Sequence, residues 1–217
     1  MKTCVIIPTL NESKEIAQLV SEVRQQDLEV LVVDDGSGDD TAGIAENSGA
    51  IVLRNRGNQG KGYSLIRGFD YALNAGFDAV ITMDGDGQHL AEDIPYFIRL
   101  AKYSNSAILI GNRMQKVKNM PLVRRVTNRF MSWLISTLAK QDVPDSQCGF
   151  RLIKKEVLEN VKFTCAKYEI ESEMIIKSAR LGFKIESVPI KAIYNGEKSQ
   201  INPFIDTLRF IRFITTV

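Results

Sequence analysis

Short apolar runs, each followed by polar residues, alternate with helix-like segments through the first half of this 217-residue chain. The runs span residues 3–8, 29–33, 50–53, 79–83 and 107–110. Runs that are short and almost continuously apolar are typical of strands covered on both faces. Their alternation with helices predicts an α/β domain built on a doubly wound, mostly parallel sheet.

Helical spacing of apolar residues marks the segments between these strands. In the first segment, which opens at residues 11–13 and runs to about residue 26, Ile16, Leu19 and Val23 fall on one helix face. Further helices are expected from residue 39 and over residues 60–74, 91–103, 121–138 and 203–215, with a strand at 183–189. There is no internal repeat or clear linker, and a chain of this length buries roughly 70% of its unfolded surface. One domain over residues 1–217 is therefore expected.

Three polar loops follow predicted strand ends. They are residues 8–12 (Pro-Thr-Leu-Asn-Glu), 34–37 (Asp-Asp-Gly-Ser) and 84–88 (Asp-Gly-Asp-Gly-Gln). In open α/β sheets, ligands bind beyond the carboxyl ends of the parallel strands, where such loops meet. The sequence therefore predicts a polar binding site at one edge of the sheet.

The third loop carries two carboxylates, Asp84 and Asp86, directly after a buried strand. Hard oxygen ligands of this kind suit Mg²⁺ or Mn²⁺, which bridge phosphate oxygens. Gln88 adds an amide oxygen and His89 an imidazole. A solvated turn is the alternative, because Asp and Gly are common turn formers, but the position after a buried strand favours a metal and diphosphate site.

Acids and glycines also follow the second strand, in residues 34–41. The G-x-G-x-x-G spacing is absent and the paired carboxylates would repel a bare pyrophosphate, so Asp35 is expected to contact a base or ribose. A helix N-cap and turn is the alternative for part of this segment. Residues 56–62 (Arg-Gly-Asn-Gln-Gly-Lys-Gly) lack P-loop spacing. Either they open a helix with Lys61 near bound phosphates, or they form a flexible surface turn.

A single histidine and three widely spaced cysteines exclude several kinds of site. Without a CxxC pair a zinc cage is not expected, and the thiols are predicted to be reduced, as in a cytosolic protein. Cys148 has no candidate base nearby in sequence, so it is predicted to be a packing residue. No apolar stretch reaches the roughly 18 residues of a membrane-spanning helix, and no signal peptide opens the chain. The chain is therefore not expected to cross a membrane.

Residues 113–141 are both basic and apolar. They contain seven cations and no carboxylate: Arg113, Lys116, Lys118, Arg124, Arg125, Arg129 and Lys140. Large apolar residues such as Phe130 and Trp133 lie between them, and residues 203–217 repeat the combination. Basic amphipathic helices suit anionic membrane surfaces, whereas packing against the sheet is the alternative. For the C-terminal helix we favour the membrane surface.

Five motifs occur in an order that is more specific than any one of them. They are Val5–Glu12 (VIIPTLNE), Val32–Ser37 (VVDDGS), Asn58–Gly62 (NQGKG), Met83–His89 (MDGDGQH) and Asp145–Arg151 (DSQCGFR). Together they resemble family 2 glycosyltransferases, in particular the branch of dolichol-phosphate mannose synthase and polyprenyl-phosphate glucosyltransferases. The resemblance covers residues 3 to about 200. It implies the GT-A fold, a Mg²⁺ or Mn²⁺ ion, a nucleotide-diphosphate sugar and inversion at the anomeric carbon.

The resemblance also implies roles for residues at matching motif positions. The expected nucleoside contacts are Pro8, Leu10, Glu12 and Asp35. Metal and diphosphate would be held by Asp84, Asp86 and Gln88. Arg113, in a Gly-Asn-Arg that matches a family Gly-Ser-Arg, would approach an acceptor phosphate, with looser matches at Arg124, Arg125 and Lys198. Residues 1–112 would then form a nucleotide-sugar-binding half, and residues 113–217 an acceptor-binding half.

The sequence therefore predicts an inverting transferase that moves mannose or glucose from a GDP-mannose or UDP-glucose type donor to a dolichyl or undecaprenyl phosphate. Such an enzyme would lie on the cytoplasmic face of the membrane. A lipid phosphate, with a second pKa of about 6, needs cations rather than a general base. A carbohydrate or glycolipid hydroxyl is the alternative acceptor, for which Asp145 would be the base.

Two other classes of protein share some of these features. A sugar nucleotidyltransferase would need a basic glycine-rich loop after the first strand, where this chain has Pro8–Glu12. A non-catalytic nucleotide-binding module would also place paired acids after a strand, but it would tolerate Asp86→Ala. The net charge of +2 gives no reason to expect a nucleic-acid partner.

Overall fold

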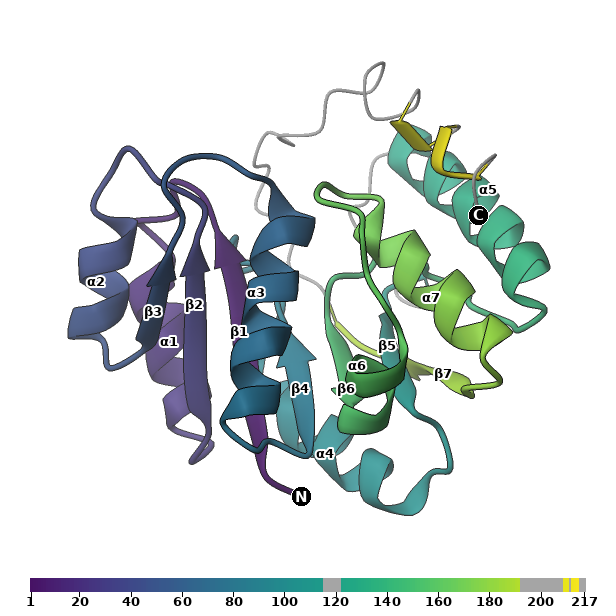
Figure 1. Cartoon of the computed structure of the whole chain (residues 1–217), viewed down its shortest axis with the longest axis horizontal. Coiled ribbons are helices and arrows are strands. Elements are labelled where there is room, and N and C mark those ends of the chain that lie inside the picture. Colours follow the sequence, from purple (N-terminus) through teal and green to yellow (C-terminus); the bar gives the residue numbers. More distant parts are fainter. Residues whose placement is uncertain (115–121, 192–208, 211, 215–217) are drawn as a thin grey trace.

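The structure, a computed structural model, describes residues 1–114, 122–191, 209–210 and 212–214, without the side chains of Val123 and Arg124. These residues form a seven-stranded sheet in the order β3-β2-β1-β4-β6-β5-β7 (Figure 1). The strands are β1 (Thr3–Thr9), β2 (Glu29–Asp34), β3 (Ile51–Arg54), β4 (Ala79–Thr82), β5 (Ile108–Asn112), β6 (Arg151–Lys154) and β7 (Ile185–Pro189). The predicted α/β class with a mostly parallel sheet is confirmed.

Helices cover both faces of the sheet. They are α1 (Ile16–Arg24), α2 (Thr41–Asn47), α3 (Lys61–Asn74), α4 (Ile94–Tyr103), α5 (Leu122–Ala139), α6 (Lys155–Asn160) and α7 (Ile170–Arg180), with a short 3₁₀ turn at Ala91–Asp93 before α4. In Figure 1, α3, α6 and α7 lie in front of the sheet, with α1 and α4 behind it. Helix α5 packs on α7, so it forms an outer layer on that side.

Strand β6 is the main departure from the predicted topology. It runs antiparallel between β4 and β5, whereas β1, β2, β3 and β4 pair in parallel. Only four residues long, it begins at Arg151 and ends at Lys154, so no apolar run marks it in the sequence. Helices α6 and α7 were not predicted either. Buried Glu171 and Glu173 interrupt the apolar pattern of α7 and conceal it.

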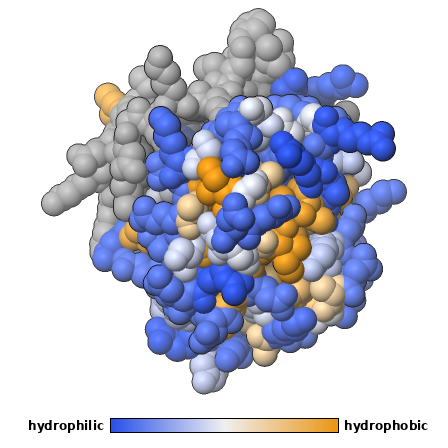
Figure 2. Space-filling view, turned by 90° about the vertical axis from the view of Figure 1, so that its left-hand side faces the viewer, coloured by the Kyte–Doolittle hydropathy of each residue, from blue (hydrophilic) through white to orange (hydrophobic). Residues whose placement is uncertain are grey.

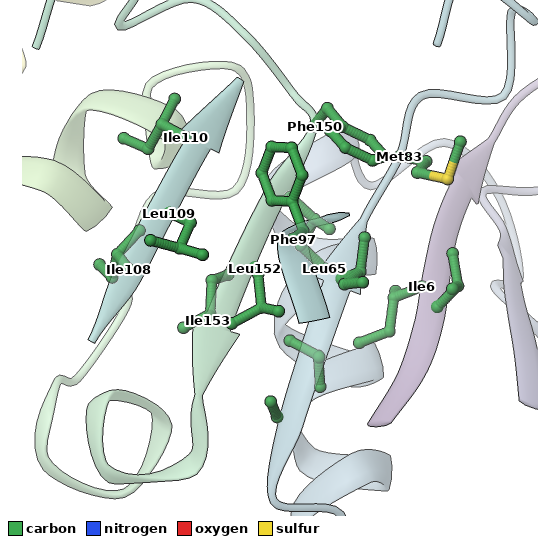
Figure 3. Close-up of a cluster of buried hydrophobic side chains, with 14 of the residues drawn as sticks. Ile6, Leu65, Met83, Phe97, Ile108, Leu109, Ile110, Phe150, Leu152 and Ile153 are labelled. Atoms are coloured by element: carbon green, nitrogen blue, oxygen red, sulfur yellow. The ribbon is translucent and has the colours of Figure 1, made fainter. Parts of the chain in front are cut away.

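An aromatic contact helps to hold β6 in the centre of the sheet. The ring of Phe97, from α4, meets Phe150 edge to face at 4.6 Å between centroids. Phe150, Leu152 and Ile153 are at most 1% exposed, and all lie in the same apolar cluster as Phe97 (Figure 3). Burying side chains of this size is worth about 1.5–3 kcal/mol each. The start of β6 is thus fixed by close packing.

The surface around β3 illustrates an ordinary sheet edge. Figure 2 views the molecule from the end where α2 and β3 lie and shows a mostly hydrophilic surface with an apolar area at its centre. β3 is the outermost strand there, and its Ile51 is 37% exposed. Some apolar exposure is normal on the surface of soluble proteins.

The described part of the C-terminal segment packs on the protein core. Residues 209–210 and 212–214 are helical, Phe213 is 7% exposed, and Phe210 and Ile214 pack against the core cluster. Our prediction that the apolar side of this helix lies on a membrane is therefore wrong for the described residues. The two arginines of this segment, Arg209 and Arg212, are exposed. Within the described part of the chain, no helix has the length and hydropathy needed to span a bilayer.

A buried carboxylate fastens α7 to the loop before it. Glu173 is 1% exposed and accepts hydrogen bonds from the backbone N–H groups of Thr164 at 3.0 Å and Cys165 at 2.9 Å, and from Lys177 Nζ at 2.5 Å. Burial alone would raise the pKa of Glu173, but the bonds from Lys177 and Thr164 outweigh it and lower this pKa below its usual 4.5.

We expect Glu173→Gln to reduce the free energy of unfolding by about 2 kcal/mol at pH 7, the usual worth of hydrogen bonds to a buried charge. A carboxylate with a lowered folded-state pKa stabilises the fold above pH 4.5 and loses this effect as the pH falls below that value. The difference between wild type and variant should therefore shrink at pH 3.5. Urea denaturation at both pH values measures it, with exposed Glu156→Gln as the control; a difference independent of pH would contradict the assignment.

Candidate active site

The carboxyl ends of four strands lie along one edge of the sheet. β1 pairs in parallel with both β2 and β4, and β5 points the same way as β4 because both are antiparallel to β6. The loops after Thr9, Asp34, Thr82 and Asn112 therefore meet there, together with the residues that lead into β6. This confirms the predicted convergence of polar loops.

The loops after β1 and β2 are hydrogen-bonded to each other. Ser37 Oγ accepts from the Asn11 backbone N–H at 2.9 Å, Asn11 Oδ1 accepts from the Gly38 N–H at 2.8 Å, and Thr41 Oγ1 accepts from the Glu12 N–H at 2.9 Å. Asn11 has a φ of 59°, a left-handed conformation that asparagine tolerates better than most residues. Pro8, Leu10 and Glu12 lie in this braced region and are half-buried. Their nucleoside contacts remain predictions.

Asp35 anchors the glycine-rich loop before α3. It is 4% exposed, and its carboxylate accepts from Asn55 Nδ2 at 2.7 Å and from the backbone N–H groups of Gln59 at 2.9 Å and Gly60 at 2.7 Å. Gly60 is buried, with a φ of 107° that favours glycine. The loop is thus held in place, which excludes the flexible surface turn. Whether Asp35 also contacts a nucleoside stays a prediction.

Lys61, the first residue of α3, lies between two carboxylates. Its Nζ pairs with Asp84 Oδ1 and, at 2.5 Å, with Glu171 Oε1 of α7. The side chain of Lys61 is 16% exposed, that of Asp84 27% and that of Glu171 10%. Lys61 therefore lies beside the Asp84 loop, and its contact with donor phosphates stays a prediction. Glu171 is a neighbour that sequence reasoning missed.

The electrostatics of this group are set by that pairing. Burial disfavours charge on both Lys61 and Asp84, but their mutual attraction outweighs it. The pKa of Lys61 is raised, with Glu171 adding to the effect, and the pKa of Asp84 is lowered. Both residues are charged at neutral pH. Lys61 and Arg151, whose terminal nitrogen lies 3.9 Å from Glu171 Oε2, balance Asp84 and Glu171. The net negative charge therefore comes from Asp86, and it attracts a further cation.

Gly149, which lies just before β6, packs against the side chain of Asp84. A Cβ atom on Gly149 would lie 2.4 Å from Asp84 Oδ2, so only glycine leaves the carboxylate room. Thr82 Oγ1 donates to the Gly149 carbonyl oxygen at 2.7 Å, which ties the end of β4 to the same residue. Thr82 and Gly149, which are 67 positions apart in the sequence, therefore both help to determine the conformation of the candidate metal site.

His89 supports the loop from within rather than lining it. The imidazole is 3% exposed, its Nδ1 accepts from the Asp84 backbone N–H at 3.3 Å, and its Nε2 lies 3.9 Å from Cys148 Sγ. Burial lowers the pKa of His89 to about 4, so the ring is neutral at physiological pH. Our suggestion that His89 offers an imidazole ligand does not fit these contacts. Cys148, which is fully buried, is the packing residue that we predicted.

Asp86 and Gln88 form the tip of the loop. The Gln88 backbone N–H donates to Asp86 Oδ1 at 3.0 Å across Gly87, whose φ is 68°. Both side chains are half-buried, as Asp84 is. Among the described residues there is no cluster of three or more His, Cys, Asp or Glu side chains of the kind that cages a metal. An ion at this loop would therefore take part of its shell from a ligand or water, which is usual for Mg²⁺ at phosphate sites.

Arg113 and Asp145 form a buried ion pair after β5. The backbone N–H and Nε of Arg113 donate to Asp145 Oδ2 at 3.0 and 2.8 Å, and one terminal nitrogen donates to Oδ1 at 2.9 Å. Arg113 is 5% and Asp145 1% exposed. A general base must reach its substrate, and Asp145 is buried with both oxygens engaged. The structure thus argues against Asp145 as the base for a hydroxyl acceptor, and makes it the residue that orients Arg113.

The remaining acceptor candidates are Arg124, Arg125 and Lys198. Arg125 lies on α5 and is half-buried. The side chain of Arg124 and the whole of Lys198 lie outside the described residues. Their predicted contacts to an acceptor phosphate remain predictions.

Residues 4–162 match the family model described as glycosyl transferase family 2. The chain belongs to this family. It is 31% identical over 213 residues to UDP-N-acetylglucosamine–dolichyl-phosphate N-acetylglucosaminyltransferase of Methanococcus voltae, with 88% of this chain and 85% of that protein covered. It is 28% identical over 203 residues to polyprenol monophosphomannose synthase of Mycolicibacterium smegmatis, with 87% of this chain and 76% of that protein covered. The chain is accordingly a glycosyltransferase.

The fold of this family 2 enzyme is shared with solved structures. One of them is glucosyl-3-phosphoglycerate synthase from Mycobacterium tuberculosis in complex with Mn²⁺, UDP-glucose and phosphoglyceric acid. The TM-score is 0.78 at 20% sequence identity, and the match covers 99% of this chain and 79% of that one. The expected GT-A fold is therefore confirmed.

Proposed function

We propose that this enzyme transfers a hexose, with inversion, from a nucleotide-diphosphate sugar to a polyprenyl phosphate. One observation carries the proposal: the negatively charged Asp84 loop and the buried cation Arg113 meet at the same edge of the sheet. The relatives named above for transfer to dolichyl phosphate and for polyprenol monophosphomannose synthesis support the lipid-phosphate acceptor.

On the donor side, Asp84, Asp86 and Gln88 would hold a Mg²⁺ or Mn²⁺ ion. The site's net negative charge and its oxygen ligands fit such an ion, and the solved relative contains Mn²⁺ together with UDP-glucose. When bound, a divalent ion stabilises the negative charge that builds on a leaving diphosphate. Lys61 adds a fixed positive charge beside the same carboxylate, and Glu171 holds the lysine there.

On the donor's nucleoside side, residues of the β1 and β2 loops would bind. Pro8, Leu10 and Glu12 line this part of the edge, and Asp35 holds the loop that places Lys61. GDP-mannose and UDP-glucose types both agree with these residues. A UDP-N-acetylglucosamine donor, named for the Methanococcus relative, joins them as a candidate.

On the acceptor side, a phosphate needs a cation more than a base. With a second pKa of about 6, a phosphate monoester is largely dianionic at neutral pH and is itself the nucleophile. Arg113 would draw that dianion toward the anomeric carbon, and Asp145 keeps the guanidinium in one orientation. Residues 1–112 would then serve mainly the donor and residues 113–217 mainly the acceptor. Such an enzyme works at the cytoplasmic face of the membrane, where it meets both substrates.

A panel of nucleotide-sugars with Mn²⁺ and farnesyl phosphate tests the proposal. We expect transfer from one donor, to give a glycosyl phosphate that mild acid cleaves and whose anomeric configuration, by NMR, is opposite to that of the donor. A product stable to mild acid would show a hydroxyl acceptor and contradict the proposal. Retention of configuration would contradict the inverting mechanism alone.

A further inference from the structure

Helix α5 turns its largest apolar side chains toward solvent. Leu122 is 73% exposed, Val126 60%, Phe130 59% and Trp133 63%. At about 100° per residue, the spacing of these four residues places them within an arc of roughly 80° on the helix surface. The rings of Phe130 and Trp133 are in contact, with 6.0 Å between centroids. The four residues form one apolar stripe, which we call the α5 stripe.

The opposite face of α5 explains why the helix has this orientation. Asn128 is 8% exposed, Ser132 4%, Ile135 0% and Ala139 6%, and all four face the protein. Ser132 Oγ accepts from the Ser146 backbone N–H at 2.9 Å, which fixes the rotation of the helix. Apart from Ile135, these inward residues are small or polar, whereas four large apolar residues face out. A surface helix usually turns its large apolar residues toward the core.

A contiguous apolar stripe of this kind marks an interaction surface. Elsewhere in the described part of the chain, no element carries more than two exposed large apolar side chains. Helix α4 has Tyr96 and Tyr103, β3 has Ile51, and Leu181 follows α7. The α5 stripe is the one place among the described residues where four of them share a helix face.

The charges around the stripe decide what covers it. Arg129 is exposed and, by its spacing, lies at the edge of the stripe, while Arg125 is half-buried at its margin. Lys140, which directly follows the helix, is also exposed. The sequence of α5 contains no carboxylate. Two copies of this helix would bring like charges together, which disfavours self-association. An anionic lipid surface instead accepts the apolar residues and attracts the cations.

We propose that the α5 stripe is the surface by which this protein lies on an anionic membrane. The proposal goes beyond the proposed function, because it names the contact surface and requires anionic lipid, but it agrees with an acceptor that is embedded in a bilayer. The boundary between lipid headgroups and acyl chains is a favoured position for Trp rings, and Phe is common on the apolar face of helices that lie there. The orientation follows from α5: the face packed on α7 points away from the bilayer.

The single tryptophan of the chain, Trp133, makes the test direct. We expect its fluorescence to shift to the blue with vesicles of phosphatidylglycerol and phosphatidylcholine, to be quenched when the lipids carry bromine in their chains, and to respond weakly to phosphatidylcholine alone. Val126→Gln combined with Phe130→Gln should weaken binding to the anionic vesicles at least tenfold in co-sedimentation. Tyr103→Gln, which removes an exposed aromatic residue on α4, should leave binding unchanged.

Three results would overturn the proposal: no shift with anionic vesicles, equal binding to neutral vesicles, or a dimer in sedimentation velocity that the double variant dissociates. Transfer to farnesyl phosphate without vesicles is measured in parallel. The double variant should keep that activity, since neither residue lies at the Asp84 loop or Arg113. Loss of vesicle binding with retained transfer separates a failure of this proposal from a failure of the proposed function.

Discussion

Asp84→Asn is expected to reduce sugar transfer about a thousandfold, which corresponds to about 4 kcal/mol of barrier. The substitution removes one of the two carboxylates that would hold the divalent ion, and such an ion contributes several kcal/mol to the stabilisation of a leaving diphosphate. It also weakens the pairing of Lys61 with residue 84, while Lys61 keeps its ion pair with Glu171. Transfer rates with a labelled donor, together with Mn²⁺ binding by calorimetry, measure both effects.

Two variants separate loss of the ion from loss of the fold. Asp27→Asn changes an exposed acid with a left-handed φ of 57°, which asparagine also tolerates, so its activity should equal that of wild type. Lys61→Met removes the ammonium paired with Asp84 and leaves Glu171 with Arg151, so Mn²⁺ should raise its melting temperature by more than that of wild type. If Asp84→Asn bound Mn²⁺ as tightly as wild type does, the metal assignment would be wrong.

The second large effect is expected at Arg151, where Arg151→Leu should cost about 3–5 kcal/mol of stability. The guanidinium is 1% exposed and donates to the backbone carbonyl oxygens of Cys148 at 2.8 Å, Ser146 at 2.8 Å and Glu171 at 2.7 Å. Leucine would leave three buried acceptors without donors, and each unsatisfied acceptor costs about 1–3 kcal/mol. For a chain of this size the melting temperature should fall by about 10 °C.

Arg151→Lys serves as the matched variant. A lysine keeps the charge, but its single ammonium group cannot reach all three carbonyl groups as the planar guanidinium does. An intermediate loss of stability is therefore expected. Calorimetric melting of the two variants and wild type gives the order. If Arg151→Leu melted within a degree or two of wild type, the brace between β6 and α7 would contribute little to stability.

The first four strands could be predicted because each is a short apolar run with a polar loop after it. β6 could not, since it is four residues long and charged at both ends. Its place between β4 and β5 depends on Phe150 packing against Phe97, a contact between residues far apart in the sequence. Helix α7 was not predicted either, because the buried glutamates between Ile170 and Met174 interrupt its apolar pattern.

The candidate site shows the same division. The position of Asp84 and Asp86 follows from the strand before them, so local sequence was sufficient there. For Lys61 it left two alternatives open, a helix start near phosphates and a flexible surface turn. Glu171 contacts Lys61 although the two residues are 110 positions apart in the sequence, and no local sequence pattern predicts that pair. Asp145 illustrates the opposite error: its motif drew attention to a carboxylate, but only the structure shows that Arg113 occupies both of its oxygens.

The position of β6 also bears on whether this enzyme can be divided into modules. β5 (Ile108–Asn112) pairs with β6 and β7, and both of these strands come from later in the chain. A fragment that stopped at residue 112 would leave β5 without neighbours and β4 with an open, apolar side, and such edges promote aggregation. Chimeras that exchange acceptor preference should therefore replace loops and keep all strands, because cutting the chain between the proposed donor and acceptor halves would cut the sheet itself.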